Sequence, residues 1–265
     1  MALIGLSLGS FASAVVARLP EERSLLVSGN GAWARSSCPL CGHHLAILDL
    51  IPLVSWLWGR GRCRYCGGQI GVRYLLIELL ALCGAVGAYV FWGFTPAAFL
   101  LIAAIPLLLA LLFVDLDHMV LPDILILLLS ALALCFICLS GLEAGGGLAI
   151  LAVLLGAAVS GLIYGGLLWL VGAVMRSLLK KPALGFGDVK FFAMAGLWIG
   201  LPSLPFFMVL SGVIGLLWGV VWRFIRRADR FPFGPALILA LYFLLLLNGP
   251  RHPEISGLFS FFALS

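Results

Sequence analysis

Long apolar stretches separated by short polar segments run through the whole chain. Eight of them have the composition and approximate length of membrane-crossing helices, which need about 17–25 mostly apolar residues. They cover 2–18, 74–92, 96–114, 121–140, 148–175, 187–201, 204–222 and 234–247. The sixth and eighth are short, and the fifth is long enough to tilt. The pattern therefore predicts an all-α membrane protein with about eight transmembrane helices.

Composition supports a membrane protein. Of the 265 residues, 63% are hydrophobic and 10% are charged, whereas soluble domains are about 45–50% apolar and about 25% charged. The mean hydropathy is +1.20. The net charge of +5 would suggest nucleic acid binding in a soluble protein. In a membrane protein, basic residues gather in cytoplasmic loops, so we expect a lipid bilayer as the surroundings and no nucleic acid partner.

The basic residues also predict which side each loop faces. All but one of the 16 Lys and Arg residues fall in three segments, 18–73, 176–190 and 223–230, and the exception is Arg251. An even number of predicted spans separates each of these segments from the next, so all three lie on the same side. The positive-inside rule makes that side cytoplasmic. The turn at 113–123 falls on it too.

Four acids lie at the predicted cytoplasmic ends of spans: Asp115, Asp117, Asp123 and Asp188. Ionisable groups inside a membrane are costly and often mark function. Asp123 follows Pro122 and has a simpler interpretation as an acid in the first turn of a helix, where the dipole favours it. Asp117 has one as a solvated turn residue.

Asp115 and Asp188 favour a catalytic interpretation. Asp115 ends an unbroken apolar run before the chain turns, and Asp188 opens another run after Gly185 and Gly187. Glycine allows close backbone approach or a positive φ. Two adjacent carboxyl groups do not both ionise easily, so a pair of them supplies an acid and a base able to activate water. Spacing alone does not show that the two helix ends meet.

Two C-x-x-C pairs, Cys38–Cys41 and Cys63–Cys66, lie in the first long loop. Cytosolic thiols stay reduced, which disfavours disulfides, and two such pairs at this spacing indicate a tetrahedral zinc site. Four thiolates would close the coordination sphere, so we expect a structural zinc that folds a loop with little core of its own. A third C-x-x-C, starting at Cys135, is interpreted as helix packing.

Other residues have two interpretations each. Glu78 faces an active-site cavity or pairs with Arg73. Lys190, two residues after Asp188, stabilises a carboxylate or a substrate carbonyl, or extends to the lipid headgroups. Six tryptophans are interpreted mostly as a membrane-interface belt: Trp56, Trp58, Trp92, Trp198, Trp218 and Trp222.

Several motifs together resemble the bacterial type IV prepilin peptidases, also called prepilin leader peptidase/N-methyltransferases, which are membrane aspartyl proteases of the Gly-x-Gly-Asp type. In chain order they are GSFASAVVARLP at 9–20, LIPLVSWL at 50–57, RYLLIELL at 73–80, FVDLDHMVLPD at 113–123, GFGD at 185–188 and FPFGP at 231–235. The resemblance implies catalysis by Asp115 and Asp188. It leaves as supporting residues Gly185, Gly187, Lys190, Asp117 and Asp123.

The resemblance also implies a function and a location. The substrates would be prepilins or pseudopilins, whose basic leaders are cut off at the cytoplasmic face of the bacterial inner membrane. The new N-terminus would be methylated with S-adenosylmethionine, for which Gly61 in the cysteine loop is a candidate. The chain would divide into a first span (1–18), a cytoplasmic zinc loop (19–73), a polytopic aspartyl protease core (74–247) and a short non-cytoplasmic tail (248–265).

Two other classes share some of these features. A presenilin-like intramembrane protease would have the same aspartates but would not explain the zinc loop or the FPFGP segment. A non-enzymatic channel or transporter would use the intramembrane acids for ions. The sequence predicts no oligomeric state.

Overall fold

The computed structural model describes residues 1–18, 36–38, 40–143, 147–180, 184–226 and 231–250. In this part of the chain there are helices and two isolated β-bridges but no β-strand, which confirms the all-α prediction. The long helices are α1 (Ala2–Arg18), α3 (Val72–Trp92), α4 (Pro96–His118), α5 (Asp123–Glu143), α6 (Gly147–Leu179), α7 (Phe186–Ile199), α8 (Leu204–Arg226) and α9 (Gly234–Leu247). Shorter ones are α2 (Val54–Trp58), η2 (Ile47–Leu50) and η3 (Leu201–Ser203).

A helix lies over each predicted span, but not every helix is long enough to cross a bilayer alone. Among the described residues, five helices are long and apolar enough, namely α3, α4, α5, α6 and α8. The 14 residues of α7 and of α9 would extend only about 21 Å, against a hydrocarbon core of about 30 Å. The structure therefore supports a multi-pass membrane protein with at least five membrane-length helices.

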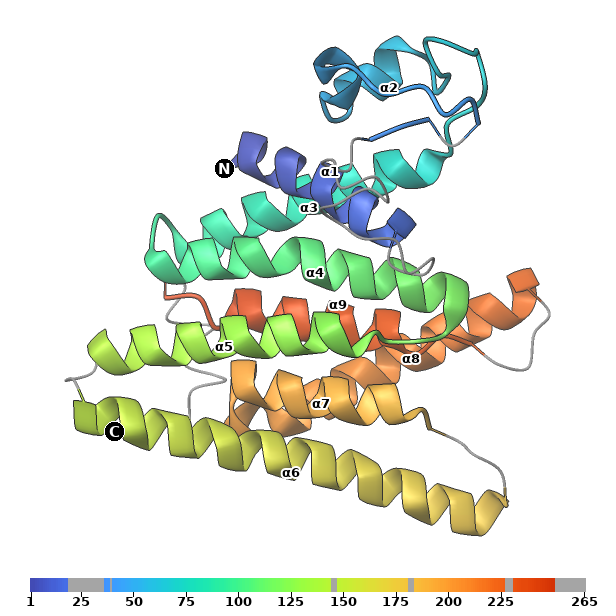
Figure 1. Ribbon diagram of the computed structural model, residues 1–265. Helices are drawn as coiled ribbons and strands as arrows, with labels where there is room; N and C mark the ends of the chain where they lie inside the picture. Colours follow the sequence, from blue (N-terminus) through green and yellow to red (C-terminus); the bar gives the residue numbers. More distant parts are fainter. Residues whose placement is uncertain (19–35, 39, 144–146, 181–183, 227–230, 251–265) are drawn as a thin grey trace.

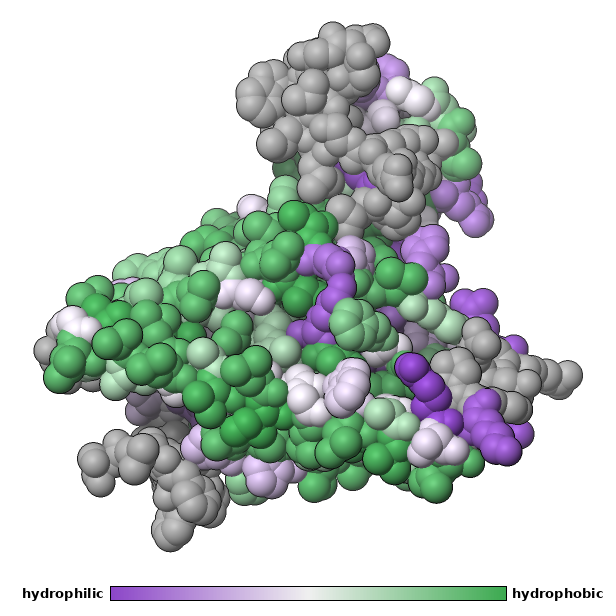
Figure 2. Space-filling model, turned by 60° about the horizontal axis from the view of Figure 1, so that its bottom comes forward, coloured by the Kyte–Doolittle hydropathy of each residue, from purple (hydrophilic) through white to green (hydrophobic). Residues whose placement is uncertain are grey.

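The packing of the helices places α4 at the centre of the helical body. It packs against α1 and α3 on one side and against α5 and α9 on the other, while α7 joins α6 to α5 and α9. Within its most apolar window, 72% of α4 is buried, compared with 17% of α6 and of α8. Figure 2 shows the apolar surface that the outer helices present over much of the helical body.

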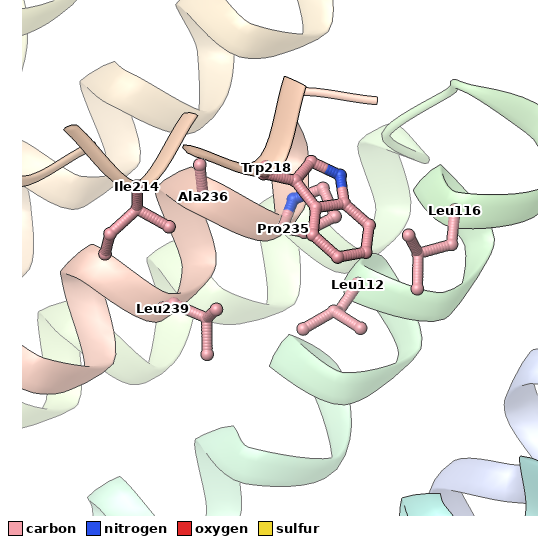
Figure 3. Close-up of a pocket in the computed structure, with 7 residues that line it drawn as sticks. All are labelled: Leu112, Leu116, Ile214, Trp218, Pro235, Ala236 and Leu239. Carbon is pink, nitrogen blue, oxygen red and sulfur yellow. The ribbon is translucent and has the colours of Figure 1, made fainter. Parts of the chain in front are cut away.

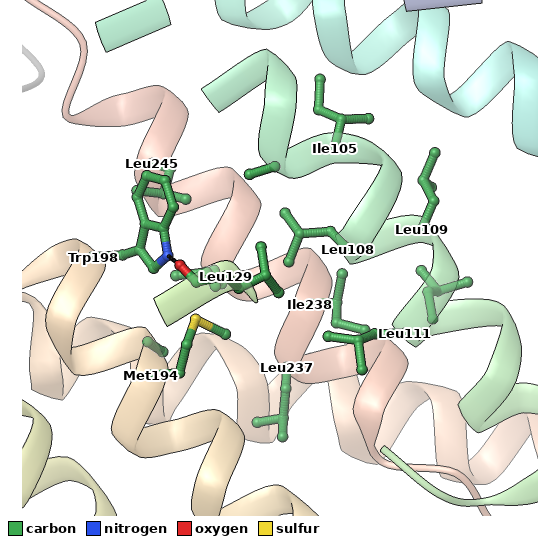
Figure 4. Close-up of a cluster of buried hydrophobic side chains, with 14 of the residues drawn as sticks. Ile105, Leu108, Leu109, Leu111, Leu129, Met194, Trp198, Leu237, Ile238 and Leu245 are labelled. Carbon is green, nitrogen blue, oxygen red and sulfur yellow. Dashed lines mark hydrogen bonds between the residues drawn. The ribbon is translucent and has the colours of Figure 1, made fainter. Parts of the chain in front are cut away.

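The core is built from leucines and isoleucines of α4, α5 and α9, together with Met194 and Trp198 of α7 (Figure 4). Two tryptophans belong to this interior. Trp198 Nε1 donates to the Leu129 carbonyl at 3.1 Å, and Trp92 Nε1 donates to the Leu245 carbonyl at 2.9 Å. The interface-belt prediction is therefore wrong for these two, because helix packing gives each indole a buried acceptor.

Candidate active site and metal centre

Asp115 lies inside α4 and not in the turn after it. Although the predicted span stopped at 114, the helix continues to His118, and Met119 ends it with a left-handed backbone (φ 53°) while donating its N–H to the Asp115 carbonyl at 2.8 Å. The side chain of Asp115 is therefore directed by helix geometry into the protein interior, where it is only 4% exposed.

The start of α9 supplies the partner of Asp115. The N–H of Gly234 donates to Asp115 Oδ2 at 2.9 Å, across 119 positions of sequence. Pro235 follows in the first turn and suits that place because its missing N–H would have no helical acceptor. The positive end of the helix dipole thus faces the carboxylate. A Cβ at Gly234 would lie 2.5 Å from that oxygen, so only glycine allows this contact.

Asp188 reaches the same region from α7. It stands in the first turn, and its Oδ2 accepts the N–H of Gly185 at 3.3 Å. Gly187 allows close packing, because a Cβ there would lie 3.2 Å from Leu121 Cβ. Leu121 also lies against Gly234, where an added Cβ would be 3.1 Å from Leu121 Cδ2. One leucine therefore joins the Asp188 turn to the Asp115 contact.

Asp115 and Asp188 are both held next to Leu121, through Gly234 and Gly187 respectively. Both glycines of the GFGD motif have negative φ, so of the two reasons for glycine considered above, close approach is the one that applies. The end of α4 and the starts of α7 and α9, which carry these contacts, lie at one end of the helical body (Figure 1). Such a pair, sharing one proton, has the composition of an acid and base that activate water.

Asp117 forms an ion pair with Arg73 of α3, so it is not merely a solvated turn residue. Arg73 Nη2 also donates to the Phe113 carbonyl at 3.2 Å, and the guanidinium lies 5.2 Å from the centre of the Phe113 ring. Arg73 therefore connects the start of α3 to the end of α4, two residues before Asp115. In the sequence, the only indication of this role for Arg73 was its position as a lone arginine at the start of an apolar span.

Glu78 does not pair with Arg73, which pairs with Asp117 instead. Its Oε2 accepts the N–H of Leu53 at 2.7 Å. Leu53 has a φ of 60° at the start of α2, a backbone that leucine rarely adopts. Glu78 thus attaches the cysteine loop to α3.

Lys190 and Asp123 pair with each other. Lys190 Nζ lies 2.8 and 2.7 Å from the two carboxylate oxygens and 5.0 Å from the centre of the Phe186 ring. Asp123 is also the first residue of α5, as the cap interpretation predicted. The pair joins α5 to α7 beside Asp188.

The four loop cysteines form one cluster, with all their sulfur atoms within 4.8 Å of one another. The two knuckles repeat each other. Gly42 donates to the Cys38 carbonyl as Gly67 donates to that of Cys63, each at 2.9 Å, and both glycines have φ near +70° (69° and 68°).

This donor set fits zinc. In a tetrahedral site with Zn–S bonds of about 2.3 Å, sulfurs lie roughly 3.8 Å apart, which the cluster accommodates. The backbone N–H of Cys41, followed by that of Leu40, lowers the pKa of the Cys38 thiol to about 7. Such donors favour the thiolate that a metal requires.

Gly61 lies in the same loop, but its surroundings explain the glycine without a ligand. Its φ is +68°, and a Cβ would lie 2.9 Å from the ring of Trp56. Its N–H donates to the Trp56 carbonyl at 2.9 Å. The absent side chain makes room for Trp56, so these contacts assign no methyl-donor site to Gly61.

Fold and site together define a class: a helical multi-pass membrane protein with paired carboxylates at one end and a four-cysteine loop. Comparison with known proteins narrows that class. Residues 3–94 match the bacterial peptidase A24 N-terminal domain, and residues 102–220 match the type IV leader peptidase family. These segments contain the four cysteines and both aspartates, respectively. The chain belongs to the type IV leader peptidase family.

Curated relatives agree over nearly the whole chain. Proteins named prepilin leader peptidase/N-methyltransferase are 38% identical in Aeromonas salmonicida (strain A449), covering 92% of this chain and 88% of the relative, and 33% identical in Pectobacterium carotovorum subsp. carotovorum, covering 94% and 92%. The Pseudomonas aeruginosa relative of that name is 36% identical, covering 92% and 88%. No solved structure matches significantly.

Proposed function

We propose that this protein is a membrane aspartyl endopeptidase that removes basic leaders from type IV prepilins or pseudopilins and then methylates the new N-terminus. The observation that carries the peptidase assignment is the meeting of Asp115, Asp188 and the N-terminus of α9 around Leu121. Family membership supports the substrate class, because the relatives are named for prepilin leader cleavage.

In the proposed mechanism, Asp115 and Asp188 hold one proton between them. The ionised carboxylate takes a proton from water, and the water oxygen attacks the scissile carbonyl carbon. The protonated carboxyl group gives its proton to the carbonyl oxygen. Collapse of the tetrahedral intermediate breaks the C–N bond: the leaving nitrogen takes a proton from the protonated carboxyl group, and the ionised carboxylate takes one from a hydroxyl of the intermediate, which restores the one-proton pair. Gly234 holds one oxygen of Asp115 and thereby fixes which way the other faces.

The position of the pair suits a cut at the membrane boundary. The ends of α4, α6 and α8 and the starts of α5, α7 and α9 gather on one side of the molecule (Figure 1). The basic residues in the last turns of α6 and α8, Arg176, Arg223 and Arg226, belong to those same ends. We infer that this is the cytoplasmic face of the bacterial inner membrane. A leader kept in the cytoplasm by its positive charges would meet the aspartates there.

The remaining divisions of the chain are part of the same proposal. The expected cytoplasmic loop, 19–73, is stabilised by zinc, and the expected polytopic core, 74–247, is the protease. The earlier loop residues 19–35 and most of the expected tail, 251–265, lie outside the described residues. S-adenosylmethionine is the proposed methyl donor, a co-substrate for the second activity, and Gly61 remains a candidate without structural support.

The test of the peptidase is cleavage of a model prepilin in membranes by wild type, Asp115→Asn and Asp188→Asn. We expect each variant to lose at least about 10³-fold in rate, as removal of a catalytic group does elsewhere. Asp49→Asn, which changes a carboxylate bonded to Tyr65 in the loop, serves as the matched control and should keep wild-type rates. Full cleavage by either active-site variant would refute the mechanism.

The cleavage position separates this function from its rivals. A cut between the basic leader and the apolar segment supports a prepilin peptidase. A cut within the lipid-embedded segment would indicate a presenilin-like enzyme. An intact precursor with wild type, together with ion flux that depends on Asp115, would indicate a transporter.

A further inference from the structure

A small apolar hollow lies between α4, α8 and α9, and its lining residue Leu116 is next to Asp115 in the chain. It encloses about 130 Å³ and is lined by Leu112, Leu116, Ile214, Trp218, Pro235 and Leu239, among others (Figure 3). Engineered protein cavities of about 150 Å³ bind benzene, whereas a whole helix is about 10 Å wide. The hollow thus has room for one bulky apolar side chain and not for a helix.

The hollow begins at the level of the candidate active site and continues into the membrane body. Leu112 and Leu116 flank Asp115 on α4, and Pro235 follows Gly234, whose N–H binds Asp115. The chain directions of α4, α8 and α9 place Leu112, Ile214 and Leu239 about one turn deeper. An occupant therefore extends from the level of Asp115 away from the proposed cytoplasmic face.

Trp218 adds an unpartnered hydrogen-bond donor. Its Nε1 is buried, and within the described part of the chain no acceptor lies in reach. In a membrane interior, where water is scarce, an unpaired N–H is costly. Trp92 and Trp198, by contrast, donate to backbone carbonyls. An acyl chain could fill the hollow, but its methylene groups would leave this donor unpaired.

We propose that the hollow is the subsite for a bulky apolar side chain of the substrate on the membrane side of the scissile bond, and that Trp218 Nε1 donates to a substrate backbone carbonyl. This inference rests on the proposed function. A peptide bond must leave a helix to be cut, which frees carbonyl groups beside it. Such a carbonyl is the acceptor that Trp218 lacks.

Photo-cross-linking tests occupancy without requiring turnover. In an Asp188→Asn background, benzoylphenylalanine replaces Leu239 in the hollow or, as the control, Leu216, which is 70% exposed on α8. With a model prepilin, we expect adducts from position 239 within about four residues of the cut, on its membrane side, and at least about tenfold fewer from position 216. Three results would contradict the proposed subsite: adducts with lipid only, adducts with the leader, or equal adduct yields from positions 239 and 216.

Kinetics test the fit of the side chain. Ile214→Trp fills the hollow, and Val213→Trp places the same ring on an outer face of α8, where Val213 is 51% exposed. For a substrate with a bulky apolar residue at the bound position, we expect Ile214→Trp to lower kcat/KM about tenfold and Val213→Trp to leave it unchanged. For a substrate with alanine at that position, we expect the rate of Ile214→Trp to be within about threefold of the wild-type rate. Equal losses for both substrates, or for both variants, would contradict the subsite.

Trp218→Phe and Trp222→Phe form a matched pair. Both indole nitrogens are buried without an acceptor among the described residues, and of the two only Trp218 lines the hollow. We expect about a tenfold loss of kcat/KM from Trp218→Phe, in line with one lost hydrogen bond, and less than about twofold from Trp222→Phe. Equal losses would attribute the effect to α8 itself. Failure of wild type to cleave any prepilin would instead refute the proposed function. The cross-linking pattern would still test whether a substrate side chain occupies the hollow.

Discussion

At the scale of single residues, Gly234 decides how Asp115 is presented. The backbone N–H of a helix start binds the carboxylate, and the glycine is required because any Cβ would displace the oxygen it holds. The sequence contained a partial signal, since Gly-Pro at the start of an apolar run is typical of a helix N-terminus. It gave no indication that this N-terminus meets an acid 119 positions earlier.

Gly234→Ala should therefore damage activity while leaving the fold intact. A Cβ only 2.5 Å from Asp115 Oδ2 must move the carboxylate or the start of α9, and a displacement of about 1 Å costs on the order of 10²-fold in rate. Gly212→Ala on α8, where an added Cβ meets nothing within 4 Å, is the control. Prepilin cleavage rate and melting temperature, measured together, check the prediction. A wild-type rate in Gly234→Ala would show that the contact is dispensable.

At the scale of elements, two side chains of α3 attach other parts of the molecule to this helix. Arg73 holds the end of α4 through Asp117 and the Phe113 carbonyl, and Glu78 holds the start of α2 through Leu53. The sequence indicated that both were unusual residues at a span entrance. It did not indicate their partners, because a charged group at a helix end pairs with whichever element tertiary packing brings to it.

Arg73→Gln should loosen the end of α4. We expect kcat/KM for prepilin cleavage to fall about tenfold, since Asp115 is two residues beyond the held carbonyl. In a double-mutant cycle with Asp117→Asn, the coupling free energy for unfolding should be about 0.5–1 kcal/mol, because the pair is partly exposed. Purely additive effects would show that the ion pair does not act on α4.

The cysteine loop should bind metal and depend on it for order. Purified protein is expected to contain about one zinc per chain, measured by mass spectrometry of the metal, and none after all four cysteines are changed to serine. Chelation should expose residues 36–71 to protease while helical content stays nearly constant, because the loop has little apolar core of its own. Cys135→Ser in α5 is the control. Zinc retained without the four thiols would place the metal elsewhere.

At the scale of the whole molecule, the end of α4 and the starts of α5 and α7, which carry the acids, lie on one side (Figure 1). The short helix η3, which connects the end of α7 to the start of α8, lies on the opposite side. Among the residues that the structure describes, five helices have the length to cross a bilayer, and shorter ones, α7 and α9, pack among them. Packing makes such short helices tolerable, because their ends contact protein instead of lipid.

Thiol labelling can check the orientation. In a background without Cys83, Cys135 and Cys138, Met119→Cys should react with a membrane-impermeant reagent from the cytoplasmic side, and Leu201→Cys from the other. The two positions are 45% and 40% exposed, so access should differ through sidedness alone. Labelling of the background protein, which keeps the four loop cysteines, shows how much those thiols react. Labelling of both positions from the same side would refute the topology.

By itself, the sequence determined what depends on local pattern. Apolar length and charge placement predicted the helical ranges and the expected sidedness. Cysteine spacing predicted the cluster of four cysteines, since knuckles form from residues close together in the chain. Tertiary structure alone decided which helix ends meet. It extended α4 so that Asp115 turns inward, brought Gly234 to that carboxylate, paired Arg73 with Asp117, and placed Trp218 over an apolar hollow. These contacts join segments separated by tens of residues, and they depend on packing among helices whose apolar surfaces are nearly uniform in composition.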